Sequence, residues 1–255
     1  MKKIKLLLIT ILSTSTLLLA NVPSWFKKLP ESPKGIYLEV GCASTFNNFK
    51  LAREVAVYRA IKNLAKQIQI EIIFQMLMQS DGHYRLGLPD YEEIYEQEIL
   101  FRVIDNVKVL DSLIINNKSY YLVQYPASAK SVKNYSKKVS WGKKPAWINN
   151  LPEDNKFIYG FGQTANYVNY IRAWQDTDSF SRFDLGRNIC ISVINMRDEK
   201  VTNKGSTLRT YSTQFYDIIL YNNKVVERWY DKNQDIYYSL SRIPKNSYKI
   251  NPKIY

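Results

Sequence analysis

The sequence predicts an α+β protein built from two tandem repeats, each with one helix packed on a mostly antiparallel sheet in strand-helix-strand-hairpin order. Three observations lead to this prediction. A motif in which prolines flank a tryptophan occurs twice. After each copy, apolar residues recur first every three or four positions and then alternate, and an Asn-Asn-Lys turn separates apolar stretches later on. A recurring motif indicates copies of one folding unit, and the two periods indicate a helix followed by a strand.

The motif reads PSWFKKLP at residues 23–30 and PAWINNLP at residues 145–152, each followed by an Ile-Tyr pair and a glycine. Matching positions differ by 122 at first (145 against 23) and by 121 later (162 against 41), which indicates a one-residue deletion in the loop. Further on, YYLV at 120–123 matches YYSL at 237–240. The structural signature of the repeat comprises Pro23, Trp25, Tyr37, Gly41, Pro145, Trp147, Tyr159 and Gly162.

The first repeat begins with a short apolar strand at residues 36–40. From residue 49 to 67 the spacing of apolar side chains predicts an amphipathic helix. Apolar residues then alternate from 68 to 79, which predicts a strand with one buried face. The outer side of the helix carries the basic residues Arg53, Arg59, Lys62 and Lys66.

The rest of the first repeat contains a loop and a hairpin. Residues 81–90 form the loop, and residues 92–105 fit a helix and a strand equally well. The stretches 107–115 and 119–125 form a hairpin, because the asparagines between them tolerate the left-handed backbone of a tight turn.

The second repeat is predicted to follow the same order. Its helix covers residues 169–187, and the alternating stretch 188–196 is its next strand. A hairpin follows, with 207–221 paired to 225–230 and continued by a strand at 236–242. The predicted segments of the chain are a signal peptide (1–20), a first repeat (21–130), a Lys-rich linker (131–143), a second repeat (144–244) and an extended polar tail (245–255).

Residues 1–20 are typical of an export signal. Lys2, Lys3 and Lys5 supply a positive start, residues 6–12 an apolar centre, and Ala20 a small residue for cleavage. The alternative is an uncleaved membrane anchor, which the Ser-Thr-Ser-Thr run before Leu17 disfavours. We therefore expect cleavage after Ala20 and a periplasmic or secreted protein.

The formal net charge is +13 at pH 7. A basic excess of this size favours anionic partners such as lipid head groups or cell-wall polymers. The alternative explanation is compositional, since a genome rich in A and T would produce a chain rich in Lys, Asn, Ile, Tyr and Phe. Export argues against nucleic acid as a partner.

Residues with catalytic or metal-binding chemistry are scattered along the chain. His83 stands alone in a loop, whereas a catalytic histidine needs a third group to orient it. Cys42 and Cys190 lie at non-equivalent places in the repeats, which favours two separate thiols over a disulfide. We expect no catalytic residue, no cofactor and no metal site. Carboxylates cluster twice, at Asp90, Glu92 and Glu93 and at Asp176, Asp178 and Asp184, and for both clusters a solvated face is favoured over a hydrolase pair.

The five tryptophans divide into two groups. Trp25 and Trp147 occupy matching positions, which predicts a packing role at one end of each core. Trp141, Trp174 and Trp229 have no counterpart in the other repeat, so they are predicted to lie on a contact surface.

The Pro-x-Trp motif, the Tyr…Gly strand, the Ala- and Arg-rich helix over residues 52–65 and the closing Tyr-Tyr strand together resemble the LPP-twenty lipoprotein family. That family comprises small envelope proteins of epsilon-type bacteria, including relatives that build the disc around the flagellar motor. The resemblance implies a non-catalytic scaffold or adaptor at the periplasm or outer membrane. Its partners would be envelope proteins, copies of itself or flagellar-disc components. Asn21 stands where family members carry a lipidated cysteine. The alternative is a binding module for anionic glycan or lipid surfaces, which would use the basic helix and the linker lysines.

Overall fold

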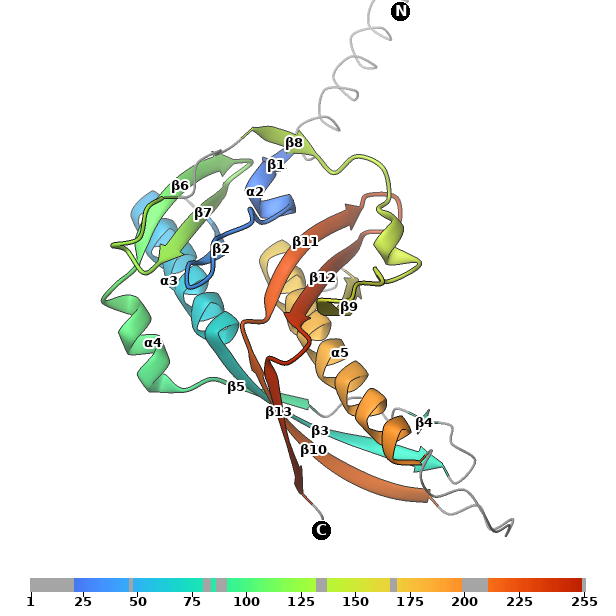
Figure 1. Cartoon of the computed structure of the whole chain (residues 1–255). Helices are drawn as coiled ribbons and strands as arrows, with labels where there is room; N and C mark the ends of the chain where they lie inside the picture. Colours follow the sequence, from blue (N-terminus) through green and yellow to red (C-terminus); the bar gives the residue numbers. More distant parts are fainter. Residues whose placement is uncertain are drawn as a thin grey trace, which may run out of the picture.

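The computed structural model places helices against antiparallel sheets, which confirms the predicted α+β class (Figure 1). The predicted signal peptide and His83 lie outside the described residues. Within the described part, no helix is both long and apolar enough to cross a membrane. The structure describes residues 21–45, 48–79, 84–85, 91–131, 137–165, 169–198 and 211–253.

The chain order of the elements is as follows. The first half contains β1 (Asn21–Pro23), α2 (Ser24–Lys27), β2 (Tyr37–Ser44), α3 (Phe49–Ile68), β3 (Gln69–Gln79), β4 (Tyr84–Arg85), β5 (Tyr91–Ile94), α4 (Gln97–Ile104), β6 (Lys108–Ile115) and β7 (Lys118–Tyr125). Next come β8 (Lys138–Ser140) and the short 3₁₀ helix η1 (Ala146–Ile148). The second half contains β9 (Phe157–Ala165), α5 (Tyr170–Asp198), β10 (Tyr211–Tyr221), β11 (Lys224–Asp231), β12 (Ile236–Pro244) and β13 (Tyr248–Lys253).

The first half contains the predicted hairpin. Strands β6 and β7 pair through a turn at Asn116 and Asn117, whose φ angles of 49° and 57° require the left-handed region that asparagine tolerates. Strand β2 joins β7 to give the sheet order β2-β7-β6. Helix α3 starts where the Asn48 side chain accepts a hydrogen bond from the Leu51 amide, and it ends one residue later than predicted.

Helix α3 packs closely on β2, and helix α5 packs in the same way on β9. A Cβ atom on Gly41 would lie 2.0 Å from the Ala56 carbonyl oxygen, and one on Gly162 would lie 2.1 Å from that of Thr177. Only glycine permits this approach of helix backbone to strand backbone. The sheet under α5 has the order β11-β12-β9.

Each of the two small sheets has one register shift, between Val109 and Asp111 in β6 and between Val225 and Glu227 in β11. The residue facing Asp111 is Leu122, and the residue facing Glu227 is Leu240. The structure therefore matches Leu122 to Leu240. The alignment of YYLV with YYSL instead pairs Leu122 with Ser239, so that alignment was wrong by one residue.

The strand after each helix does not return to the small sheet, contrary to prediction. Strand β3 pairs with β10 in an antiparallel ribbon that runs from Gln69–Tyr221 to Gln79–Tyr211. Strands β13, β4 and β5 complete this sheet, so β10 is not part of a hairpin with β11. The predicted polar tail supplies β13. Figure 1 shows the ribbon extending away from the two small sheets.

The predicted strand at 188–196 was also wrong, because α5 continues to Asp198. Leu185 and Ile189, one helical turn apart, are both fully buried against β3 and β10 together with Ile72 and Ile218. A helix presents these side chains to the ribbon on one face. Tertiary packing therefore overrides the alternating pattern.

The largest core cluster draws side chains from both halves. Trp25 and Tyr120 of the first half pack with Trp147 and Tyr237 of the second. The prediction that the unmatched tryptophans form a contact surface was wrong, since all three are buried inside this cluster, where the Trp141 and Trp174 rings stack. The buried residues concerned are Trp141, Trp174 and Trp229. Both cysteines are buried free thiols, as expected.

Candidate functional site

Charged side chains, three of them buried and three half-buried, converge on a cavity of about 140 Å³ between α3, α5 and the outer edge of β2. One wall is apolar and includes Phe26, Ile171 and Trp174. The charged lining consists of five cations and one carboxylate: Arg59, Lys62, Lys66, Arg182, Arg228 and Asp178.

Arg228 and Asp178 form the most buried ion pair. Arg228, on β11, is 1% exposed, and Asp178, on α5, is 6% exposed. The Arg228 Nε and Nη2 atoms donate to the carboxylate at 3.0 and 2.8 Å, and the Ser239 hydroxyl donates to the same carboxylate at 2.5 Å. Arg228 also stacks on the Phe26 ring at 5.1 Å. These contacts satisfy both buried charges and join α2, α5 and β11.

Glu93 holds a second buried cluster in which one carboxylate meets two cations. Its oxygens accept from Arg182 Nε at 2.8 Å and from Lys66 Nζ at 2.5 Å. Burial alone would raise the pKa of Glu93, but the two cations outweigh it and hold the pKa at about 2. Burial and the nearby Arg182 lower the pKa of Lys66. The cluster carries an excess of positive charge.

Two polar side chains of α3 cap the open edge of β2. Arg59 Nη1 donates to the Cys42 carbonyl at 2.8 Å, and Asn63 Nδ2 donates to the Val40 carbonyl at 3.0 Å. Lys62 Nζ lies 5.4 Å from the centre of the Tyr58 ring. Within the described ranges, no carboxylate forms an ion pair with Arg59 or Lys62.

Glu39 lies in β2 next to these groups and is 2% exposed. Its carboxylate accepts one hydrogen bond, from the amide of Val40 at 3.2 Å. Burial raises the pKa of Glu39 to about 7, against the opposing pull of Arg228. The carboxyl therefore titrates near neutral pH.

The arrangement fits binding of an anion better than acid–base or nucleophilic chemistry. Burial raises the pKa of the Cys42 thiol to about 12, so this cavity residue is a protonated thiol and a poor nucleophile. The Asp178 carboxylate already accepts hydrogen bonds from Arg228 and Ser239. Among the described side chains, no three histidine, cysteine, aspartate or glutamate residues converge as metal ligands.

The structure brings together three of the four basic residues singled out on the first helix. Arg59, Lys62 and Lys66 line the cavity, whereas Arg53 is exposed outside it. The signature residues Pro23, Trp25, Gly41, Trp147 and Gly162 are buried, and of these Gly41 lines the cavity.

The prediction of a solvated acidic face on the second helix was wrong for two of its three members. Asp178 and Asp184 are buried; Asp184 accepts a hydrogen bond from the amide of Phe161 at 2.9 Å. Asp176 is half-buried, with its side chain 19% exposed, and pairs with Arg172 of the preceding turn.

The sequence reasoning missed Arg228, and it placed Glu93 on a solvated face, whereas the Glu93 side chain is buried and paired with Arg182 and Lys66. Arg228 lies between Glu227 and Trp229 in a predicted strand, and this local sequence does not indicate a buried ion pair with Asp178.

Comparison of the chain with protein-family models, with curated proteins and with solved structures gave no match. The class of the protein therefore comes from the structure itself: it is an α+β protein with a basic cavity between two helices.

Proposed function

We propose that this chain is a non-catalytic, exported adaptor of the bacterial cell envelope that binds protein partners. The export signal in the sequence and the resemblance to the LPP-twenty family support a place in the periplasm or at the outer membrane, with envelope proteins, flagellar-disc components or further copies of the chain as partners.

We further propose that the adaptor consists of two copies of one α+β unit. The matching glycines support this, since Gly41 and Gly162 accept the same close approach of a helix, at Ala56 and at Thr177. Both pairs differ by 121 positions (162 against 41, and 177 against 56). The equal sheet orders and the equivalent register shifts add support.

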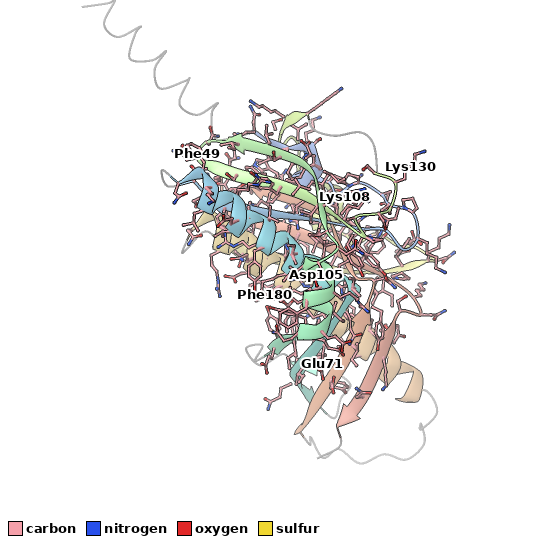
Figure 2. All side chains as sticks on the ribbon, turned by 90° about the vertical axis from the view of Figure 1, so that its left-hand side faces the viewer. Phe49, Glu71, Asp105, Lys108, Lys130 and Phe180 are labelled. Carbon is pink, nitrogen blue, oxygen red and sulfur yellow. The ribbon has the colours of Figure 1, made fainter. Side chains whose placement is uncertain are left out.

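The observation that carries the adaptor function is the distribution of exposed apolar side chains. All the large exposed hydrophobic residues among those described belong to the first half, on α3, β5, α4 and β6. Figure 2 shows α3, α4 and β6 together on the side that faces the viewer. Phe101, on α4, is 61% exposed. Exposed apolar surface concentrated on one side is typical of a protein-binding face. This face comprises Phe49, Leu51, Tyr58, Ile94, Phe101, Ile104, Val109 and Ile114.

A photo-crosslinking amino acid placed at Phe101 tests the proposal in living cells. We expect a discrete crosslinked species at position 101 and none from the same amino acid at Lys232, an exposed residue in the turn between β11 and β12. Equal, diffuse crosslinking at both positions would contradict an adaptor face in the first half. Normal motility, disc assembly and envelope integrity after deletion of the gene would contradict the envelope role.

The basic cavity favours a second candidate function, the binding of an anionic ligand. The lining contains five cations against one carboxylate, and two of those cations have no ion-pair partner in the described part of the chain.

A further inference from the structure

We infer that the cavity between α3 and α5 is a binding site for a single phosphate group, held by the half-buried residues Arg59 and Lys62 of its lining. The inference deepens the second candidate function and does not depend on the adaptor function. The phosphate group can belong to a soluble phosphate compound or to a lipid head group, and the experiment below separates these sources.

The first argument is the charge balance. Asp178 forms an ion pair with Arg228, and Glu93 forms ion pairs with both Lys66 and Arg182. Arg59 and Lys62 add two more cations that no described carboxylate pairs with. The cavity wall therefore has more positive than negative charge even when Glu39 is ionised. A dianion relieves this excess better than a monoanion, and phosphate is the common biological dianion of compact size.

The second argument is size. Sites for drug-sized ligands enclose roughly 300–1,000 Å³, whereas this cavity measures about 140 Å³. A water molecule occupies roughly 30 Å³ of liquid, so the cavity holds one compact group of a few heavy atoms. A nucleotide or an oligosaccharide does not fit inside it. A phosphate group attached to a larger molecule can enter while the remainder stays outside.

The third argument is preorganisation. The Arg59 guanidinium is held by its hydrogen bond to the Cys42 carbonyl, which uses Nη1 and leaves other guanidinium donors for a ligand. Behind it, Arg182 is fixed by Glu93 and Arg228 by Asp178. For these three arginines, binding therefore costs little side-chain ordering. The apolar wall of Ile171 and Trp174 excludes water from one side and strengthens the electrostatic attraction.

The test compares inorganic phosphate with chloride at equal ionic strength, using the purified protein. We expect phosphate to raise the melting temperature and to give a saturable calorimetric titration. Lys62→Met and Arg59→Gln should each weaken binding at least tenfold. Arg53→Gln is the matched control, because it removes the same charge from an exposed position on α3 outside the cavity; it should bind phosphate as the unaltered protein does.

Two outcomes would overturn the inference. One is the absence of stabilisation by phosphate over chloride in a protein that is folded by circular dichroism. The other is an equal loss of binding in Arg53→Gln and Lys62→Met, which would indicate diffuse attraction by the basic surface. In that second case the anion-binding function survives and only the cavity site fails. Lys62→Met protects the test against misfolding, since Lys62 has no hydrogen bond in the described structure that its loss would break.

Sedimentation with vesicles then distinguishes the two sources of the phosphate group. Vesicles of phosphatidic acid in phosphatidylcholine present a phosphate monoester, and vesicles of phosphatidylcholine alone serve as the reference. Binding to the former that Lys62→Met weakens and that free phosphate competes away supports a lipid head group in the cavity. Binding of free phosphate without vesicle binding supports a soluble phosphate compound.

Discussion

Replacing Asp178 with asparagine removes the negative charge from the most buried ion pair while keeping the size of the side chain. Arg228 is then left with its guanidinium 1% exposed, a 3.3 Å bond to the Phe26 carbonyl and no carboxylate. Removing one partner of a buried ion pair costs about 3–5 kcal/mol. Because asparagine retains one acceptor oxygen, we expect Asp178→Asn to lower the free energy of unfolding by about 3 kcal/mol.

Urea denaturation followed by circular dichroism measures this loss, and the same helix supplies the control. Asp176 forms an i,i+4 pair with Arg172, and the side chains of Asp176 and Arg172 are 19% and 62% exposed. Asp176→Asn should therefore cost no more than about 0.5 kcal/mol. The double variant Asp178→Leu, Arg228→Met should be more stable than Asp178→Asn, since it leaves no unpaired buried charge. If Asp178→Asn and Asp176→Asn cost the same, the assignment of a buried, coupled pair is wrong.

Two further predictions concern β2 and β9. Burial raises the pKa of Glu39 from 4.5 to about 7, so the folded protein binds an extra proton between these pH values and stability falls as pH rises from about 4.5 through 7. The unaltered protein should therefore lose on the order of 3 kcal/mol of unfolding free energy by pH 8, and Glu39→Gln should not show this loss. Urea unfolding at pH 5 and pH 8 measures the difference. An equal loss in both proteins would contradict the prediction. Gly41→Ala and Gly162→Ala each force a Cβ atom to about 2 Å from a helix carbonyl oxygen, so each should lower the free energy of unfolding by about 3 kcal/mol. Gly35 has open space around it, so Gly35→Ala should cost only about 1 kcal/mol, because of its positive φ. Equal losses at all three glycines would refute the close packing.

Local pattern was enough to predict the elements that bury one regular face. Helix α3 and strand β3 have clear periods of 3.6 and 2, and the asparagine turn at 116–117 needs no tertiary information. The stretch 188–196 alternates as β3 does, yet it is helical because Ile189 packs with Leu185 against the ribbon. The choice depends on β10, which already occupies the edge of β3 that a strand there would need. Such competition between distant segments has no local signal.

The candidate site was predictable only where it lies on one helix. Arg59, Lys62 and Lys66 appear in the sequence as one basic stripe at helical spacing. Arg228 meets an acid 50 positions away, and Glu93 meets Arg182 at a separation of 89. A charged residue in a strand does not reveal a partner at such a distance, so both clusters required the structure.

The buried charges explain why the two halves hold one arrangement, and they also point to a ligand. An apolar interface between α3 and α5 would be as stable as one with buried ion pairs, or more stable, because desolvation of each charge costs several kcal/mol. Stability therefore does not account for five cations around one cavity. The pairs Arg228–Asp178 and Arg182–Glu93 fix the relative positions of β11, α5 and β5. Arg59 joins α3 to β2 through its hydrogen bond to the Cys42 carbonyl, and Lys62 lies over the rings of Tyr58 and Tyr95, but neither has an ion-pair partner within the described structure. No carboxylate of the described structure pairs with either positive charge, and a bound anion would balance both.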